Sequence, residues 1–143
     1  MKINIDSDLK TTPKAIFKSF DEMNHLSEIW KISGGAHMSG LFHPDGTIAY
    51  YSEDVGRHNT LDKIIGGGVI DENDLSKLFV ATSGRISAAM VTKIARAGIP
   101  LIASISAPTA QGIDIAEKTQ ITLVGFSRVP KLNIYTNKKR IML

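Results

Sequence analysis

The sequence predicts one α/β domain whose sheet is largely parallel after an antiparallel start. Its 143 residues match the length of a single ordinary domain. With 43% hydrophobic and 22% charged residues, the chain has the composition of a globular protein. Apolar positions switch repeatedly between helical and strand spacing, which is typical of a layered domain with alternating strands and helices. In such sheets ligands bind beyond the carboxyl ends of the strands, so the loops at those ends are the first candidates for a functional site.

The first part of the chain predicts a helix and then a hairpin. Pro13 suits the first turn of a helix. The apolar residues spaced along one face of that helix are Ile16, Phe20, Met23, Leu26 and Trp30. Strands are expected at 38–42 and 47–51, joined by a turn at Pro44-Asp45-Gly46.

A second helix is expected from Gly56, with Leu61, Ile64, Ile65 and Val69 on its buried side. Glycines are poor helix formers, so the run 66–68 is expected to weaken or end this helix. After it, residues 78–81 are an apolar run of the length of a buried strand.

The last part of the chain continues the alternation. A helix with Ile86, Met90, Ile94 and Ala97 on one face ends at Gly98 and is followed by a strand at 101–105. The turn 106–109 opens a short helix to about Lys118. Strands at 122–126 and 132–135 close the domain. The domain proper is 13–143, and the polar residues 1–12 are an N-terminal extension, either a frayed end or an edge strand.

Composition excludes several classes of protein. The chain has no cysteine, which rules out a disulfide scaffold, a thiolate metal site, a cysteine nucleophile and a persulfide carrier within this chain. No apolar run approaches the roughly 18 residues of a membrane span, and no secretory signal is present, so we expect a cytoplasmic protein without membrane contact. The net charge is only +3. The basic residues near the end, Lys131, Lys138, Lys139 and Arg140, lack interleaved aromatics, so we expect a solvated tail and no nucleic-acid surface.

Four loops combine small residues with hydroxyl groups: 33–37, 53–59, 82–87 and 106–109. At least two of them are expected to open a helix, whose free N–H groups and positive dipole end attract anions. Arg57 and Arg85 are suited to hold phosphate oxygens with their forked guanidinium groups. The loops together predict a pocket for a phosphate-bearing ligand such as a nucleotide, although each alone is also consistent with ordinary capping and turn formation.

Two other kinds of chemistry have weaker support. His37, Asp54 and His58 carry metal-binding groups, but their spacing matches no ligand motif. Asp54 and His58 are four apart and could form an acid–base pair on a helix, but Asp54 is better explained as an N-cap or first-turn residue at about Gly56. The serines at 83, 87 and 106 lie in turns without a GxSxG elbow, and no P-loop is present.

Several strings at these loops are similar to those of one family. SGGAH (33–37), EDVGRHNTLDK (53–63), SGRIS (83–87), AGIP (97–100), SAPT (106–109), TLVGFSR (122–128) and NIYT (133–136) resemble the formate dehydrogenase accessory protein FdhD family. The resemblance implies a sulfurtransferase that passes sulfur from a cysteine desulfurase to the molybdenum cofactor of formate dehydrogenase. It also implies binding of the bis-molybdopterin guanine dinucleotide form of that cofactor, or of a guanine nucleotide.

The resemblance further implies a cytidine deaminase-like layered sandwich, in which a mixed sheet carries helices on both faces. Deaminases hold zinc through HxE and PCxxC patterns at the starts of two helices. Here the corresponding starts read VGRHN and SGRIS. We therefore expect the fold without the deaminase chemistry.

The resemblance assigns cofactor binding to GFSRVPK, although Val129-Pro130 departs from the glycine usual near the middle of this stretch. The residues it implicates are Phe126, Ser127, Arg128, Val129, Pro130, Lys131, Arg57, His58, Ser83, Gly84, Arg85, Ser106 and His37. No residue is assigned as catalytic or as a metal ligand.

Members of the family are about twice as long and carry sulfur on an upstream CxxC loop, which this sequence lacks. We therefore expect only the C-terminal, cofactor-binding part, not catalytic by itself. The implied partners are formate dehydrogenase, an N-terminal domain or separate chain, a second copy in a homodimer and, less directly, a cysteine desulfurase. Two alternatives stay open: a metal-dependent hydrolase or deaminase-like enzyme using His37, Asp54 and His58, and a non-catalytic docking module.

Overall fold

The computed structural model describes residues 2–27 and 35–143. The helices are α1 (Pro13–Leu26), α3 (Arg57–Ile70), α4 (Ala88–Ala97) and α5 (Ala110–Thr119), with 3₁₀ turns at Leu75–Lys77 and Lys138–Arg140. The strands are β1 (His37–Phe42), β2 (Ile48–Asp54), β3 (Phe79–Thr82), β4 (Leu101–Ser104), β5 (Thr122–Arg128) and β6 (Lys131–Thr136). The predicted order of elements is confirmed, but Trp30, Ser33 and Gly34 lie outside the described residues.

The six strands form one mixed sheet in the order β2-β1-β3-β4-β5-β6. The pairs β3–β4 and β4–β5 are parallel, whereas β1–β2, β1–β3 and β5–β6 are antiparallel. The expectation of a largely parallel sheet was therefore wrong, whereas the mixed sheet that the resemblance implies is confirmed. The last two strands are joined by a tight turn, which permits only an antiparallel return, whereas a parallel pair needs a crossover connection.

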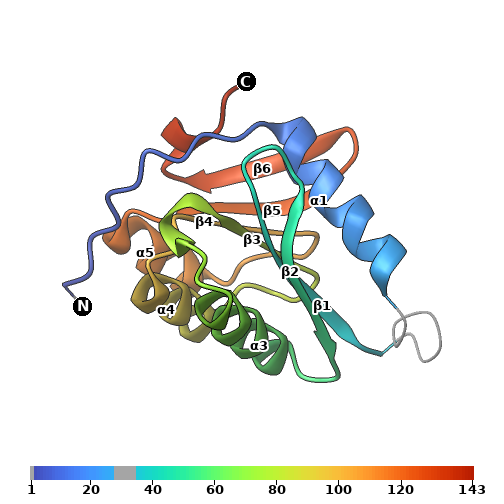
Figure 1. Cartoon of the computed structure of the whole chain (residues 1–143). Coiled ribbons are helices and arrows are strands. Elements are labelled where there is room, and N and C mark those ends of the chain that lie inside the picture. The colour runs from blue at the N-terminus through green and yellow to red at the C-terminus, as the bar shows by residue number, and fades with distance from the viewer. Residues whose placement is uncertain (1, 28–34) are drawn as a thin grey trace.

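Helices cover both faces of the sheet (Figure 1). Helices α3, α4 and α5 pack on one face, where Leu41, Val80, Ile102 and Leu123 point into the larger core. Helix α1 packs on the other face against the neighbouring positions of the same strands, which include Phe42, Phe79 and Leu101. Strand residues alternate between the two cores because successive side chains point to opposite faces of a sheet.

Helix α3 runs through the glycines at 66–68 to Ile70, so the prediction that they end it was wrong. A Cβ on Gly67 would lie 2.2 Å from the ring of Tyr50, and one on Gly68 would lie 2.7 Å from Leu41. These glycines allow the helix to approach the sheet closely. Val69, predicted on the buried side, is 61% exposed at the end of the helix.

Two other predicted faces need smaller corrections. Leu26, the last residue of α1, is 43% exposed, while Ile16, Phe20 and Met23 are buried as predicted. Ile86 is buried but precedes α4, where it forms a bridge with Pro108.

The N-terminal segment lies beside the C-terminal 3₁₀ turn (Figure 1). Ile5 and Leu9 are buried, and Thr11 pairs with Ile141 in an isolated parallel bridge. The side chain of Arg140 is fully buried, so the expectation of a solvated basic tail was wrong for this residue. Its guanidinium group donates hydrogen bonds to the N-terminal segment and to residues at the starts of β4 and β5. The number of basic residues in the tail does not indicate such contacts.

Candidate functional site

Four connections meet at one edge of the sheet. Strands β3, β4 and β5 are parallel and end at this edge. Strand β2 ends there as well, because both β2 and β3 pair with β1 in antiparallel fashion and therefore run in the same direction. Strand β1 begins at the same edge, with His37 opposite Asp54. The topology thus places the loops 53–59, 82–87 and 106–109, the start of β1 and the β5–β6 turn next to one another.

The turn after β3 is held by hydrogen bonds from β1, from β4 and from the loop after β4. Ser83 exchanges two bonds with Met38: its backbone N–H donates to the Met38 carbonyl, and its Oγ accepts from the Met38 N–H, both at 2.9 Å. Ser104 Oγ donates to the Gly84 carbonyl at 2.6 Å, and Ser106 Oγ donates to the Ser83 carbonyl at 2.8 Å. The hydroxyl groups of Ser83 and Ser106 therefore fix the turn itself.

Gly84 brings this turn into contact with the start of α3. A Cβ on Gly84 would lie 3.1 Å from Arg57 Cβ and 3.6 Å from His37 Nδ1. Arg57, Gly84 and His37, which come from three different loops, are therefore neighbours. Arg57 and His37 are half-buried, whereas Arg85 on the same turn is exposed.

Below these loops lies a chain of buried hydroxyl groups that the sequence analysis missed. Ser39 Oγ donates to Thr82 Oγ1 at 2.9 Å and lies 2.8 Å from Thr60 Oγ1. Thr60 Oγ1 donates to the Arg57 carbonyl at 2.8 Å, and Thr82 Oγ1 accepts from the Gly84 N–H at 3.3 Å. The network joins the first turn of α3 to the turn after β3. The sequence does carry a signal for this network, namely polar residues inside otherwise apolar strands. Buried hydroxyl groups need hydrogen-bond partners, so such residues indicate that other polar groups lie nearby.

The N-terminus of α3 has no side-chain cap. Its N-cap is Gly56, whereas Ser87 and Thr109 cap α4 and α5 through their hydroxyl groups. The first N–H groups of a helix have no intrahelical acceptor, so this end is suited to receive an anion. Arg57 is the first residue of the helix and adds a positive charge there.

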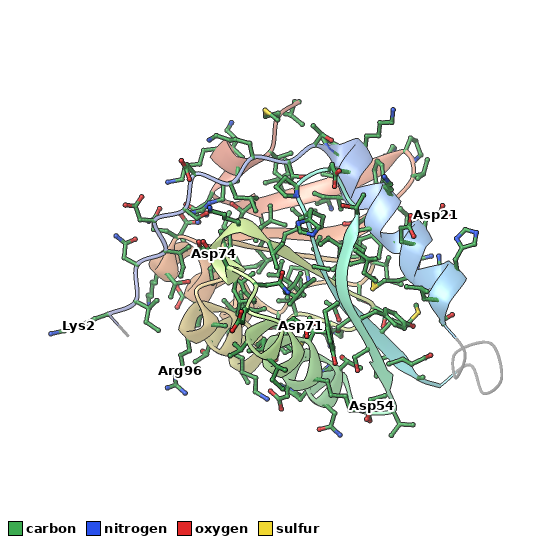
Figure 2. The ribbon with its side chains drawn as sticks, in the orientation of Figure 1. Lys2, Asp21, Asp54, Asp71, Asp74 and Arg96 are labelled. Carbon is green, nitrogen blue, oxygen red and sulfur yellow. The ribbon has the colours of Figure 1, made fainter. Side chains whose placement is uncertain are left out.

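Asp54 is the last residue of β2 and not an N-cap (Figure 2). Its carboxylate accepts from Lys63 Nζ at 2.7 Å and from the Gly56 N–H at 3.0 Å. These bonds, with that from Lys63 the larger cause, lower the pKa of Asp54 to about 2. The carboxylate therefore stays ionised and anchors the loop that leads into α3.

His58 is the second residue of α3 and is half-buried. Burial lowers its pKa below the usual 6.5, and the positive charges of Lys93 and Arg57 lower it further. The imidazole is therefore neutral near pH 7. Across residues 2–27 and 35–143, no three His, Asp or Glu side chains are arranged to hold a metal ion.

The stretch 126–131 forms the end of β5, a tight turn and the start of β6. Phe126 has a left-handed backbone with φ of 52°, and the strand register shifts between Gly125 and Arg128. This irregularity points Phe126 outward and buries Ser127. The other four residues of the stretch, Arg128, Val129, Pro130 and Lys131, are exposed.

A cavity of about 420 Å³ lies between α1 and this turn. Ser83, Ser127, Arg128 and Val129 line it, and all four were predicted as site residues. The other predicted residues do not line this cavity: Arg57, His58, Gly84, Arg85, Ser106, His37, Phe126, Pro130 and Lys131. Sequence reasoning missed the α1 wall, formed by Phe17, Asp21 and Asn24 beside the predicted core residue Phe20. Their i, i+3, i+4, i+7 spacing is the signal that marks one stripe of a helix.

The comparison with family models decides the affiliation. The model of the FdhD/NarQ family matches residues 1–142. The chain belongs to the FdhD/NarQ family. It is 41% identical over 138 residues to the sulfur carrier protein FdhD of Saccharolobus solfataricus, an alignment that covers 96% of this chain and 54% of the relative. It is 40% identical over 138 residues to the protein of the same name from Methanothermobacter thermautotrophicus, covering 96% of this chain and 55% of that one.

A solved structure supports the same family. The crystal structure of a candidate formate dehydrogenase accessory protein from Desulfotalea psychrophila superposes with a TM-score of 0.88 at 33% identity. The superposition covers 95% of this chain and 58% of that chain. The chain thus spans about half the length of the relatives of the family that it matches. None of the helices in the described part of the chain is long and apolar enough to span a membrane.

Proposed function

We propose that this chain binds a guanine-containing dinucleotide form of the molybdenum cofactor, as cargo, for the maturation of formate dehydrogenase. The observation that carries the proposal is the meeting of Arg57, Gly84 and the uncapped N-terminus of α3 at one edge of the sheet. A pyrophosphate needs cationic forks and free N–H groups, and this edge provides both. The name of a similar solved structure, a formate dehydrogenase accessory protein, suggests the destination, and the family resemblance of the sequence motifs implies the cargo.

In this proposal each group has a defined task. Arg57 and the N–H groups at the start of α3 bind phosphate oxygens, and Arg85 and Arg128 extend the positive surface from the neighbouring loops. The neutral imidazole of His58 can donate or accept a hydrogen bond at the same end of the helix. The hydroxyl groups of Ser83 and Ser106 keep the turn in place, since Ser106 Oγ donates to the Ser83 carbonyl and Ser83 Oγ accepts from the Met38 N–H. The O–H of Ser83 can still donate to a phosphate oxygen.

The sulfur-carrying step is not assigned to these residues. A persulfide forms on a thiolate, and this chain contains no cysteine. We propose that the sulfur comes from a cysteine on another polypeptide segment or chain. The fold that we propose more specifically is the cytidine deaminase-like sandwich, supported by the order of helix, hairpin and alternating helices and strands around a mixed sheet.

Thermal unfolding with GDP tests the proposal, with AMP and CMP as comparison ligands. A ligand at one hundred times its dissociation constant stabilises the folded state by about 2.7 kcal/mol. For 143 residues this corresponds to a rise in Tm of about 9 °C. We expect the rise with GDP and a clearly smaller one with AMP or CMP.

The variants Arg57→Ala and Arg85→Ala should each reduce the shift caused by GDP. Arg96→Ala is the matched control, because Arg96 is an exposed arginine near the end of α4 (Figure 2). If GDP gives no shift, or if both site variants respond as the control does, the proposed phosphate site is wrong.

A further inference from the structure

An open groove of about 680 Å³ lies between the start of α1, the turn after β1 and the end of the chain. The turn packs closely on the helix, because a Cβ on Gly46 would lie 2.5 Å from the Ala15 carbonyl oxygen. The end of the chain is held beside the helix by a bond of 2.8 Å from the Met142 N–H to the Thr11 carbonyl (Figure 1). Three segments that are far apart in the sequence thus form one fixed surface.

The floor of this groove is largely apolar. Val129 and Met142 are 76% and 51% exposed, although both are large apolar side chains. The apolar residues that line the groove are Ala15, Phe17, Pro44, Val129 and Met142. Covering such side chains is favourable, since it removes apolar surface from water.

The hydroxyl groups that line the groove already have partners. Thr11 Oγ1 donates to the Pro44 carbonyl at 2.7 Å, and Thr12 Oγ1 accepts from the Ala15 N–H at 3.1 Å as the cap of α1. A small polar ligand needs a few free polar groups that fix its orientation. The groove is therefore better suited to the apolar side chains of a polypeptide segment than to a small molecule.

Lysines form the rim of this surface, which we call the lysine groove after Lys10, Lys14 and Lys18. Lys14 and Lys18 are exposed and lie one turn apart on α1, and Lys10 precedes the helix. Lys10 Nζ donates to the Lys139 carbonyl at 2.9 Å, which brings a fourth exposed lysine close to the rim.

These lysines keep their charge available for a partner. Four other lysines pair with aspartates, whereas Lys10, Lys14 and Lys18 form no ion pair within residues 2–27 and 35–143. Of the two aspartates that line the groove, Asp45 accepts from both the N–H and the hydroxyl of Thr47, at 2.9 and 2.7 Å. The charge that complements this rim is negative.

We propose that the lysine groove docks an acidic, amphipathic segment of the enzyme that receives the cargo. The inference rests on the proposed function, in which formate dehydrogenase is that enzyme. Carboxylates of the segment pair with Lys14 and Lys18, and its apolar side chains cover Met142 and Val129. The apolar contacts supply affinity, while the charges speed association and fix the register of the segment.

The position of the groove fits the transfer of a cargo. Phe17, Asp21 and Val129 line both the lysine groove and the cavity between α1 and the β5–β6 turn, so the two are continuous. Ser83 and Arg128, from two of the loops at the edge of the sheet, also line that cavity. An enzyme docked in the groove is therefore next to the edge where we propose that the phosphates bind.

Biolayer interferometry tests the inference, with the full chain immobilised and the cofactor-free formate dehydrogenase of the same organism in solution. Lys14→Gln/Lys18→Gln keeps the helix propensity and removes two charges. It should weaken binding about tenfold, mainly through slower association, and reduce the dependence of binding on salt. Lys77→Gln/Lys118→Gln is the matched control, because it removes the same charge from two exposed lysines outside the groove.

Met142→Ser tests the apolar part of the groove. It should weaken binding about tenfold through faster dissociation, because an apolar contact is lost while the charges remain. Leu143→Ser is its control, since Leu143 is 95% exposed and does not line the groove. Equal losses in Met142→Ser and Leu143→Ser would contradict docking in the groove.

The response to GDP separates this inference from the proposed function. Lys14, Lys18 and Met142 do not line the cavity, so these variants should keep the rise in Tm with GDP. If the enzyme binds every variant equally, or does not bind while GDP still raises Tm, the docking site is wrong and the phosphate site stands. If the enzyme does not bind and GDP gives no shift, both fail.

Vesicles of phosphatidylglycerol serve as a second anionic partner. The groove is concave and its apolar floor lies between lysines and a turn, so we expect only weak binding that is the same for wild type and Lys14→Gln/Lys18→Gln. Strong vesicle binding that Lys14→Gln/Lys18→Gln abolishes, without binding of the enzyme, would assign the groove to a membrane surface and overturn the inference.

Discussion

Replacing Arg140 should destabilise the protein far more than replacing an exposed basic side chain. Its buried guanidinium group donates to the carbonyl oxygens of Ser7 and Ile5 at 3.1 Å. It also donates to the Pro100 carbonyl and to Thr122 Oγ1, both at 3.3 Å, and to the Gln120 carbonyl. The side chain thus joins the N-terminal segment to the starts of β4 and β5. Burial lowers the pKa of Arg140, but the guanidinium remains charged at any pH at which the protein is folded.

The size of the effect follows from the number of acceptors. Removing one partner of a buried, charged network costs about 3–5 kcal/mol, because the remaining polar groups keep their desolvation penalty. The entropy of unfolding of a 143-residue domain is about 0.3 kcal/mol per kelvin. Arg140→Met should therefore lower Tm by roughly 10–17 °C. Arg140→Lys keeps the charge but has only three donors, so it should recover part of the loss.

Differential scanning calorimetry measures the change in Tm, and limited trypsin digestion reports on the N-terminal segment. Lys139→Met is the control, since it removes the neighbouring exposed side chain of similar length. We expect faster cleavage after Lys10 in the Arg140 variants, because Ile5 and Ser7 lose their anchor. A drop in Tm that matches the control, with unchanged cleavage, would refute the reasoning.

Two further predictions concern stability. Gly66→Ala should raise Tm by about 3 °C, because a Cβ at Gly66 meets nothing within 4 Å and alanine favours a helix by about 1 kcal/mol. Gly67→Ala, one residue later, should lower Tm in the same calorimetric assay, since its Cβ would overlap the Tyr50 ring; equal shifts for both would contradict the packing argument. His58 resists protonation in the folded state, so its contribution to stability is present above its ordinary pKa of 6.5 and is lost as the pH falls below that value. Urea titrations should therefore show that the free energy of unfolding of the wild type falls relative to that of His58→Asn as the pH is lowered from about 7.5 to 5.5. A difference that does not change with pH would contradict the lowered pKa.

The order of elements was predictable because each is encoded by local periodicity and turn residues. Gly98 has a left-handed backbone at the end of α4, and Thr109 caps α5, as the sequence indicated. The glycines at 66–68 do not end the helix because their role is in long-range packing: Gly67 provides space for the ring of Tyr50 on strand β2. The low helix propensity of glycine is a local effect of the residue itself. In α3 it is outweighed by close packing against residues that are distant in the sequence.

The candidate site was only partly predictable for a similar reason. Topology could be inferred, so the loops were expected at one edge of the sheet. The wall formed by Asp21 and Asn24 was missed because polar residues on a helix ordinarily mark its solvated side. Ser127 gave no sign of burial in the sequence, since the irregularity at Phe126 that turns it inward depends on pairing with β6. Arg140 was misjudged because its acceptors are mostly backbone carbonyls, which carry no signal in the sequence.

Buried hydroxyl groups hold the proposed phosphate site in place. The phosphate edge is built on the hydroxyl groups of Ser39, Thr60 and Thr82, which connect the Arg57 carbonyl to the Gly84 N–H through the protein interior. All three side chains are fully buried, so breaking any link leaves an unpaired polar group and is costly. The first turn of α3 and the turn after β3 are therefore fixed relative to each other before any ligand binds. Affinity for a phosphate-bearing ligand should accordingly benefit from this preorganised edge of the sheet, because little conformational freedom is lost on binding.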